Sequence, residues 1–100
     1  MDTTMIRIAI AGAAGRMGQA LIQAVASDTE LELAHAFEQQ GHPSLGTDVG
    51  VLVGVDRIGI AVTDTIDSGD FDLLITFTTP TATMEHLTYC QSRGQRMVIG

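Results

Sequence analysis

Residues 6–18 read IRIAIAGAAGRMG, a short β-branched run that leads directly into a turn with three glycines. The run over 6–11 is apolar on both faces apart from Arg7, a pattern typical of a strand buried in a parallel sheet. From Met17 onward, apolar residues recur every three or four positions as far as residues 27–28, which predicts a helix. The face expected to be buried carries Met17, Ala20, Leu21, Ala24 and Val25.

A second strand is predicted over residues 31–37, which read LELAHAF. Alternation predicts that Leu31, Leu33, His35 and Phe37 share one face of this strand. Strand, glycine turn, helix and strand then occupy about 32 residues, the size of one βαβ unit. We therefore expect a parallel pair of strands joined by a right-handed crossover.

The rest of the chain continues the alternation of helices and strands. We expect a loop over 39–59 with a helical turn near 48–53, and a buried strand over 73–77. A short edge strand over 60–62, a helical turn over 65–68 and a last strand over 97–99 are weaker features. Between the last two strands, a helix begins at Pro80 with Thr79 as its cap and ends before Gly94. Its apolar stripe would carry Thr83, Met84, Leu87 and Cys90. The sequence predicts one α/β domain over residues 1–100, a Rossmann-like doubly wound parallel sheet of about five strands.

Composition narrows the function. The chain has 100 residues, 45% of them apolar, and a net charge of -7 from 12 acidic and 5 basic residues. All five basic residues are arginines, so a Walker P-loop and a Schiff-base mechanism within this chain are excluded. The acidic balance argues against nucleic acid as a partner.

Cysteine and histidine suggest no redox or metal chemistry. The lone Cys90 cannot form an internal disulfide and is expected in a helix core. The three histidines, His35, His42 and His86, lack metal-ligand spacing, so we expect no metal site. Without a signal peptide or a membrane-spanning run, a cytoplasmic protein with no membrane partner is expected.

The glycine turn suggests a dinucleotide. Glycines between a parallel strand and a helix let backbone N–H groups approach a pyrophosphate at the helix N-terminus. Here the pattern is G-x-x-G-x-x-G, formed by Gly12, Gly15 and Gly18, with Ala14 where the usual fingerprint has a glycine. A tight turn without a ligand is the alternative.

An acid at the end of the second strand would complete the nucleotide site. Glu38 lies 20 residues after Gly18, where an acid commonly binds the adenosine ribose, although it could also be a solvated surface residue. Gln39 and Gln40 follow it and offer no cation to a 2′-phosphate, which favours NADH over NADPH. Arg16 is the nearest cation that could reach such a phosphate.

Several segments together resemble a known family. Residues 9–18 (AIAGAAGRMG), 45–50 (LGTDVG), 71–80 (FDLLITFTTP) and 97–100 (MVIG) resemble the N-terminal signatures of bacterial 4-hydroxy-tetrahydrodipicolinate reductase, also called dihydrodipicolinate reductase. The resemblance extends over essentially the whole chain. It implies an oxidoreductase of lysine (diaminopimelate) biosynthesis that reduces the dehydrated cyclic substrate with NADH or NADPH and assembles as a homotetramer.

The resemblance also implies the site residues. Its cofactor contacts would fall on Gly12, Ala13, Ala14, Gly15, Arg16 and Met17 at the turn, Glu38 at the ribose, and Phe77, Thr78 and Gly100 beside the nicotinamide half. The family's catalytic residues belong to a C-terminal α+β domain, so they are expected beyond Gly100. The chain would then be a truncated, cofactor-binding half that is inactive alone.

Three positions depart from the family pattern. Thr76 stands where an aspartate is usual, Thr79 where a basic residue is common, and Gln39 where some members have an arginine for the 2′-phosphate.

Two alternative functions stay open: a non-catalytic nucleotide-sensing module of the same fold and an α/β domain without a ligand. A reading frame that continues beyond Gly100 into the family's second domain would favour the reductase.

Overall fold

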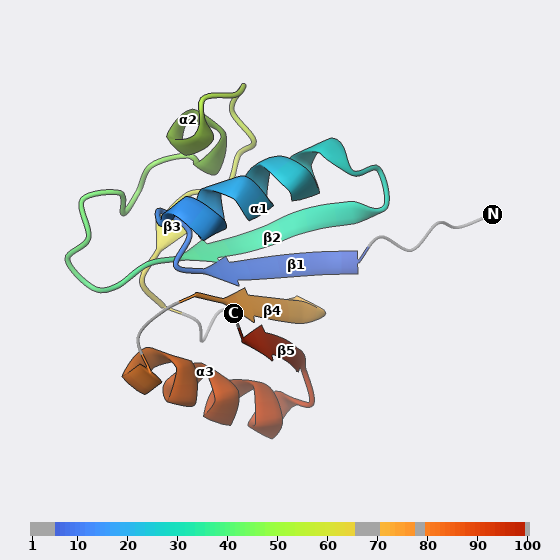
Figure 1. Ribbon diagram of the computed structural model, residues 1–100, viewed down its shortest axis with the longest axis vertical. Helices are drawn as coiled ribbons and strands as arrows, with labels where there is room; N and C mark the ends of the chain where they lie inside the picture. Colours follow the sequence, from blue (N-terminus) through green and yellow to red (C-terminus); the bar gives the residue numbers. More distant parts are fainter. Residues whose placement is uncertain (1–5, 66–70, 78–79, 100) are drawn as a thin grey trace.

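The computed structural model describes residues 6–65, 71–77 and 80–99, which form a parallel sheet with helices on both faces (Figure 1). The five strands lie in the order β3-β2-β1-β4-β5. The elements are β1 (Ile6–Ala11), α1 (Arg16–Ser27), β2 (Leu31–Phe37), α2 (Val49–Val53), β3 (Val62–Thr63), β4 (Leu73–Thr76), α3 (Pro80–Arg93) and β5 (Arg96–Ile99). This arrangement confirms the predicted α/β, Rossmann-like fold.

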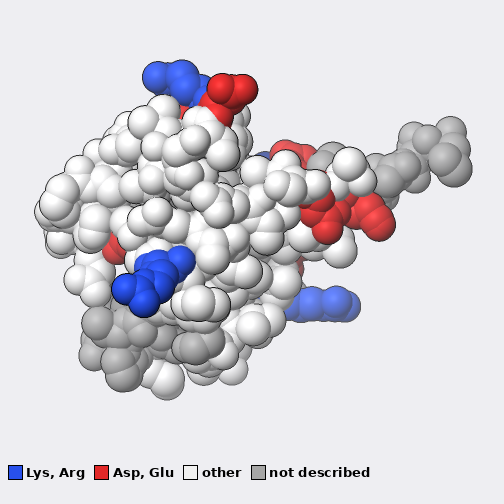
Figure 2. Space-filling model, turned by 45° about the horizontal axis from the view of Figure 1, so that its top comes forward, with Lys and Arg blue, Asp and Glu red and all other residues white. Residues whose placement is uncertain are grey.

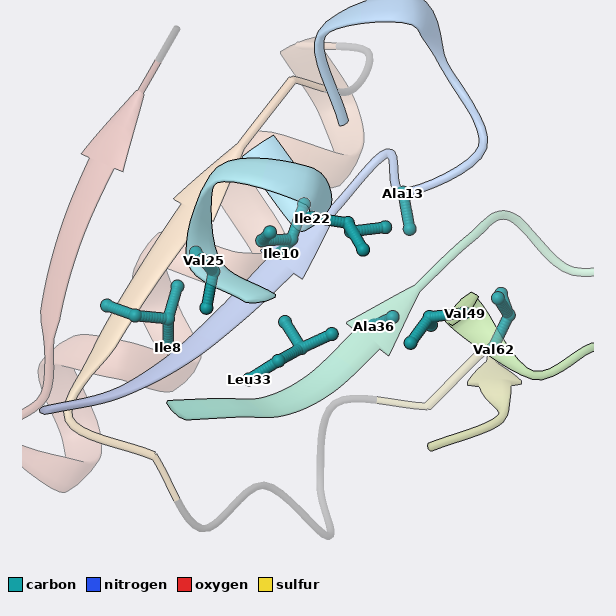
Figure 3. Close-up of a cluster of buried hydrophobic side chains, with 9 residues drawn as sticks. All are labelled: Ile8, Ile10, Ala13, Ile22, Val25, Leu33, Ala36, Val49 and Val62. Carbon is teal, nitrogen blue, oxygen red and sulfur yellow. The ribbon is translucent and has the colours of Figure 1, made fainter. Parts of the chain in front are cut away.

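The core lies in two layers, one on each face of the sheet. On one face, Ile22 and Val25 of α1 pack over Ile8 and Ile10 of β1, and the layer continues outward to α2 and β3 (Figure 3). On the other face, Cys90 of α3 belongs to a second cluster with Ala9, Ala11, Ala34, Phe37, Phe71 and Leu74. β1 is therefore buried on both sides, as its uninterrupted apolar pattern predicts.

The buried face of α1 differs from the predicted one by a rotation of about one residue. Gly18, Ile22 and Val25 face the sheet, whereas Met17 is 54% exposed and Ala20 and Ala24 lie at the surface. The physical reason is the close approach of the helix to the preceding turn, which only a residue without a Cβ allows. Position 18 therefore faces inward and sets the helix orientation.

β2 does not alternate regularly as predicted. In its pairing with β1, Ile8 is opposite Leu33 but Ala9 is opposite His35, so Ala34 is an extra residue. Leu33 accordingly packs in the α1 layer, whereas Phe37 packs in the α3 layer. The prediction that Leu33 and Phe37 share a face is wrong because this bulge reverses the alternation.

The second half of the chain follows the predicted order with shifted bounds. The predicted helical turn near 48–53 is α2, and the edge strand predicted over 60–62 overlaps β3, which begins two residues later and ends one residue later. Most of the helical turn expected over 65–68 lies outside the described residues, as does the Thr79 cap. In α3, Cys90 is buried and Leu87 is half-buried, but Met84 is 60% exposed, so its place in the apolar stripe is wrong.

Strand β5 follows α3 through a left-handed glycine. Gly94 has φ 68°, and the Gln95 N–H donates to the Cys90 carbonyl at 2.9 Å, which ends the helix as predicted. β5 pairs only with β4 among the described strands and forms one edge of the sheet. Its Val98 and Ile99 are 48% and 57% exposed.

Candidate functional site

The glycine turn closes tightly over the end of β1. Gly12 adopts φ 82°, a conformation that favours glycine. The N–H groups of Gly12 and Ala13 both donate to the Phe37 carbonyl, at 2.9 and 3.1 Å, and the Gly15 N–H donates to the Gly12 carbonyl at 3.0 Å. Most amides of the turn are therefore used internally to fix its shape.

The helix that follows starts with unused donors. Gly15 is the N-cap of α1, with extended backbone and no side-chain cap, and no acidic residue lies in the first turn. The first N–H groups of a helix have no intrahelical acceptor, so those of Arg16 and Met17 are available to an anion. Both residues are exposed, and Arg16 adds a cation. Figure 2 shows that Lys, Arg, Asp and Glu side chains are few on the face in view.

Glu38 lies against this turn rather than extending into solvent. One of its carboxylate oxygens accepts from the Ala14 N–H at 2.8 Å, and the other accepts from the Gln39 N–H at 3.1 Å. The backbone of Glu38 is held at the sheet edge by the Thr63 carbonyl, which accepts from its N–H at 2.8 Å. The sheet and the turn thus orient the carboxylate. These hydrogen bonds do not agree with the alternative that Glu38 is a freely solvated acid.

Gln19 is a contact that the sequence did not reveal. Its side-chain N–H donates to the Ala14 carbonyl at 2.8 Å, so Ala14 is held by Gln19 on one side and by Glu38 on the other. The only sequence signal was a polar residue directly after Gly18, a position that turns out to be half-buried.

Phe77 borders the turn from the other side of β1. Its N–H donates to the Ala11 carbonyl at 3.0 Å, so it extends the β4 pairing up to the start of the turn, and its side chain is half-buried. β1 lies between β2 and β4, which makes this edge the point where the strand order reverses and where such sheets bind ligands. The predicted partners Thr78 and Gly100 lie outside the described residues.

A buried carboxylate organises the neighbouring loop. Asp48, the N-cap of α2, accepts from the N–H groups of Gly50, Ile58 and Gly59 at 2.8, 2.9 and 2.6 Å. The hydrogen bond from Ile58, with those from Gly59 and Gly50, outweighs desolvation and holds the pKa of Asp48 at about 2. Its hydrogen bonds join the two ends of the loop around α2, which gives it a structural role.

The remaining candidates fall into structural positions. His35 stacks on Phe37 with ring centroids 5.8 Å apart, and His42 accepts from the Ser44 N–H at 3.0 Å within its loop. His86, predicted at the helix surface, is half-buried, and Cys90 is in the core, where burial raises the pKa of its thiol.

Within the described ranges, no group of three or more His, Cys, Asp or Glu could hold a metal ion. No helix in those ranges is both long and apolar enough to cross a bilayer.

Comparison with known proteins gives this site a context. Residues 6–100 match the family model described as dihydrodipicolinate reductase, N-terminus. Among solved structures, the chain is similar to a dipicolinate-bound dihydrodipicolinate reductase from Paenisporosarcina sp. TG-14, with 26% identity and a TM-score of 0.70 over 97% of this chain and 37% of that one.

Two further structures share the fold at lower identity. An aspartate semialdehyde dehydrogenase with NADP from Candida albicans has a TM-score of 0.75 at 15% identity, over 97% of this chain and 30% of that chain. A myo-inositol dehydrogenase from Corynebacterium glutamicum has a TM-score of 0.70 at 21% identity, over 95% of this chain and 27% of that chain. The chain thus spans about a third of the length of the structures it matches.

Proposed function

The chain belongs to the dihydrodipicolinate reductase family, and from that premise we propose that it is the domain that binds the enzyme's nicotinamide dinucleotide. One observation carries the proposal: the Glu38 carboxylate is hydrogen-bonded to the Ala14 N–H, beside the uncapped start of α1. An oriented acid and a set of helix N-terminal donors at one sheet edge match the ribose and the pyrophosphate of an adenosine diphosphate group.

The pyrophosphate would lie at the first turn of α1. Since the amides of Gly12, Ala13, Ala14 and Gly15 have internal partners, the N–H groups of Arg16 and Met17 are the donors left for its oxygens. Gly15 also lets the turn close on itself, because a Cβ at this position would come within 3.3 Å of the Gly12 carbonyl oxygen. The uncapped, exposed start of α1 beside this compact turn supports a pyrophosphate at this place.

The ribose would meet Glu38. A carboxylate accepts about four hydrogen bonds. Two are used by Ala14 and Gln39, which leaves capacity for the two hydroxyls of an adenosine ribose. A 2′-phosphate would face this fixed negative charge, so we propose a preference for NADH over NADPH. Arg16 is the nearest cation that could offset it.

The nicotinamide half would extend past β1 toward Phe77, Thr78 and Gly100. When bound, the nicotinamide supplies the hydride for reduction. The part of this chain is to orient the ring with these residues and to limit the access of water. The acid that donates the proton, and the cations for the substrate carboxylates, are assigned to a second domain beyond Gly100.

The whole enzyme would reduce the dehydrated 4-hydroxy-tetrahydrodipicolinate ring in lysine biosynthesis, as a cytoplasmic homotetramer. The family match supports this reaction, and the Paenisporosarcina relative was solved with dipicolinate bound. Residues 1–100 alone would bind the dinucleotide and turn over nothing.

Titration with NADH and NADPH, followed by nicotinamide fluorescence, tests the proposal. We expect saturable binding of NADH and weaker binding of NADPH. Absence of binding by either at millimolar concentration refutes the dinucleotide site. Tighter binding of NADPH refutes only the preference assigned to Glu38.

A further inference from the structure

The peptide that links Ala14 to Gly15 is fixed by two hydrogen bonds on opposite sides. Its N–H, on Gly15, donates to the Gly12 carbonyl at 3.0 Å. Its carbonyl, on Ala14, accepts from the Gln19 side chain at 2.8 Å. Gln19 is anchored in turn by the helix, because its own N–H donates to the Gly15 carbonyl at 2.9 Å.

This peptide needs such a restraint because glycine supplies none. Gly15 has φ −72° and ψ 169°, but a glycine populates positive φ about as readily, so the plane of the peptide before it can turn over. A turned peptide would exchange the positions of its N–H and carbonyl. An unpaired carbonyl next to the first turn of α1 would repel an anion that the helix N-terminus attracts.

We infer that Gln19 is a positioning residue for the dinucleotide: its side chain holds the Ala14 carbonyl against α1, so that this carbonyl is not directed at a pyrophosphate bound by the N–H groups of Arg16 and Met17. This inference rests on the proposed function. It assigns Gln19 a role that acts through Ala14, without contact between Gln19 and the cofactor.

The same helix provides a matched control. The side-chain N–H of Gln23, one turn further along α1, also donates to a backbone carbonyl, that of Val53, at 3.1 Å. Gln19→Ala and Gln23→Ala therefore each remove one glutamine-to-carbonyl hydrogen bond from α1. Only the first of these bonds touches the glycine turn.

The test compares three ligands in the wild type, Gln19→Ala and Gln23→Ala, after circular dichroism and urea unfolding have shown that all are folded. NADH is titrated by fluorescence, and ADP and adenosine by displacement of NADH. Loss of one hydrogen bond predicts that Gln19→Ala binds NADH and ADP about three- to tenfold more weakly. Adenosine, which has the ribose but no phosphate, should bind all three proteins equally.

Several results would overturn the inference. Equal NADH affinity of Gln19→Ala and wild type removes Gln19 from the site and leaves the proposed function standing. An equal loss for adenosine, or an equal loss in Gln23→Ala, shows a general effect on the helix instead. Failure of the wild type to bind NADH refutes the proposed function, and the inference falls with it.

Discussion

Gly18 and Gly12 are packed backbone to backbone, so that a Cβ on Gly18 would overlap the carbonyl oxygen of Gly12. The same Cβ would lie only 2.8 Å from the Cα of Ala13. This contact places the start of α1 directly on the turn and directs Ile22 and Val25 toward the sheet. The glycine thus couples the shape of the candidate site to the packing of the core.

Gly18→Ala should therefore destabilise the fold. Since the clash is with backbone atoms that cannot rotate away, we expect a loss of about 2–3 kcal/mol in the free energy of unfolding. Urea unfolding followed by circular dichroism measures it. Gly15→Ala is the control: its Cβ would lie 3.3 Å from the Gly12 carbonyl oxygen, at an allowed φ of −72°, and should cost less than about 1 kcal/mol. Equal losses in the two variants would contradict this account.

Glu38→Ala should weaken NADH binding about tenfold, because it removes both the ribose acceptor and the partner of the Ala14 N–H. Glu38→Gln keeps an acceptor but removes the charge, so the ratio of NADPH to NADH affinity should rise. Fluorescence titration measures the affinities of both variants for NADH and NADPH. Glu32→Ala, which removes an exposed acid that pairs with Arg7 at 3.5 Å, should leave the NADH affinity unchanged. An unchanged affinity in Glu38→Ala would remove Glu38 from the site.

Asp48 should make stability depend on acid pH. Its folded pKa of about 2 lies below the usual value near 4, so its contribution is complete above about pH 4 and is lost as the pH falls toward 2. We expect Asp48→Asn to be less stable at neutral pH and to lose less stability than the wild type between pH 4 and 2. Urea midpoints at a series of pH values measure this. Asp56→Asn, at an exposed acid of the same loop, controls for the loss of one acidic side chain.

Cys90 should be unreactive in the folded chain. Its side chain is 1% exposed, burial raises the pKa of its thiol, and only the thiolate attacks disulfide reagents. Reaction with an aromatic disulfide at neutral pH should be about 100-fold slower in buffer than in denaturing urea. Comparable rates in the two conditions would show that α3 does not stay packed on the sheet.

The sequence predicted those parts of the fold that depend on local patterns. β1 was evident because its residues are apolar on both faces, and the turn because three glycines follow it directly. The position of Glu38 followed from the end of β2, since the carboxyl ends of parallel strands meet at one edge of a sheet. Its role toward a ribose stays a prediction.

Other features depend on contacts between distant residues, which periodicity does not encode. The face of α1 was misjudged because Met17 fits the apolar pattern, whereas the structure turns Gly18 inward for close approach. The role of Asp48 requires amides that lie 10 and 11 residues further along the chain. The link from Gln19 to Ala14 likewise appears only once the turn has folded back onto α1.

The extra residue in β2 sets the phase of the chain that follows it. With Ala34 inserted, Leu33 and Ala36 point to the α1 layer and Phe37 to the α3 layer, so the next side chain, Glu38, returns to the side of the glycine turn. If every residue of β2 alternated regularly from Leu33, position 38 would point to the α3 face instead. The direction of the acid at the candidate site therefore cannot be counted from the start of β2, and a search for related sites by strand alternation must allow for one inserted residue four positions before the carboxylate.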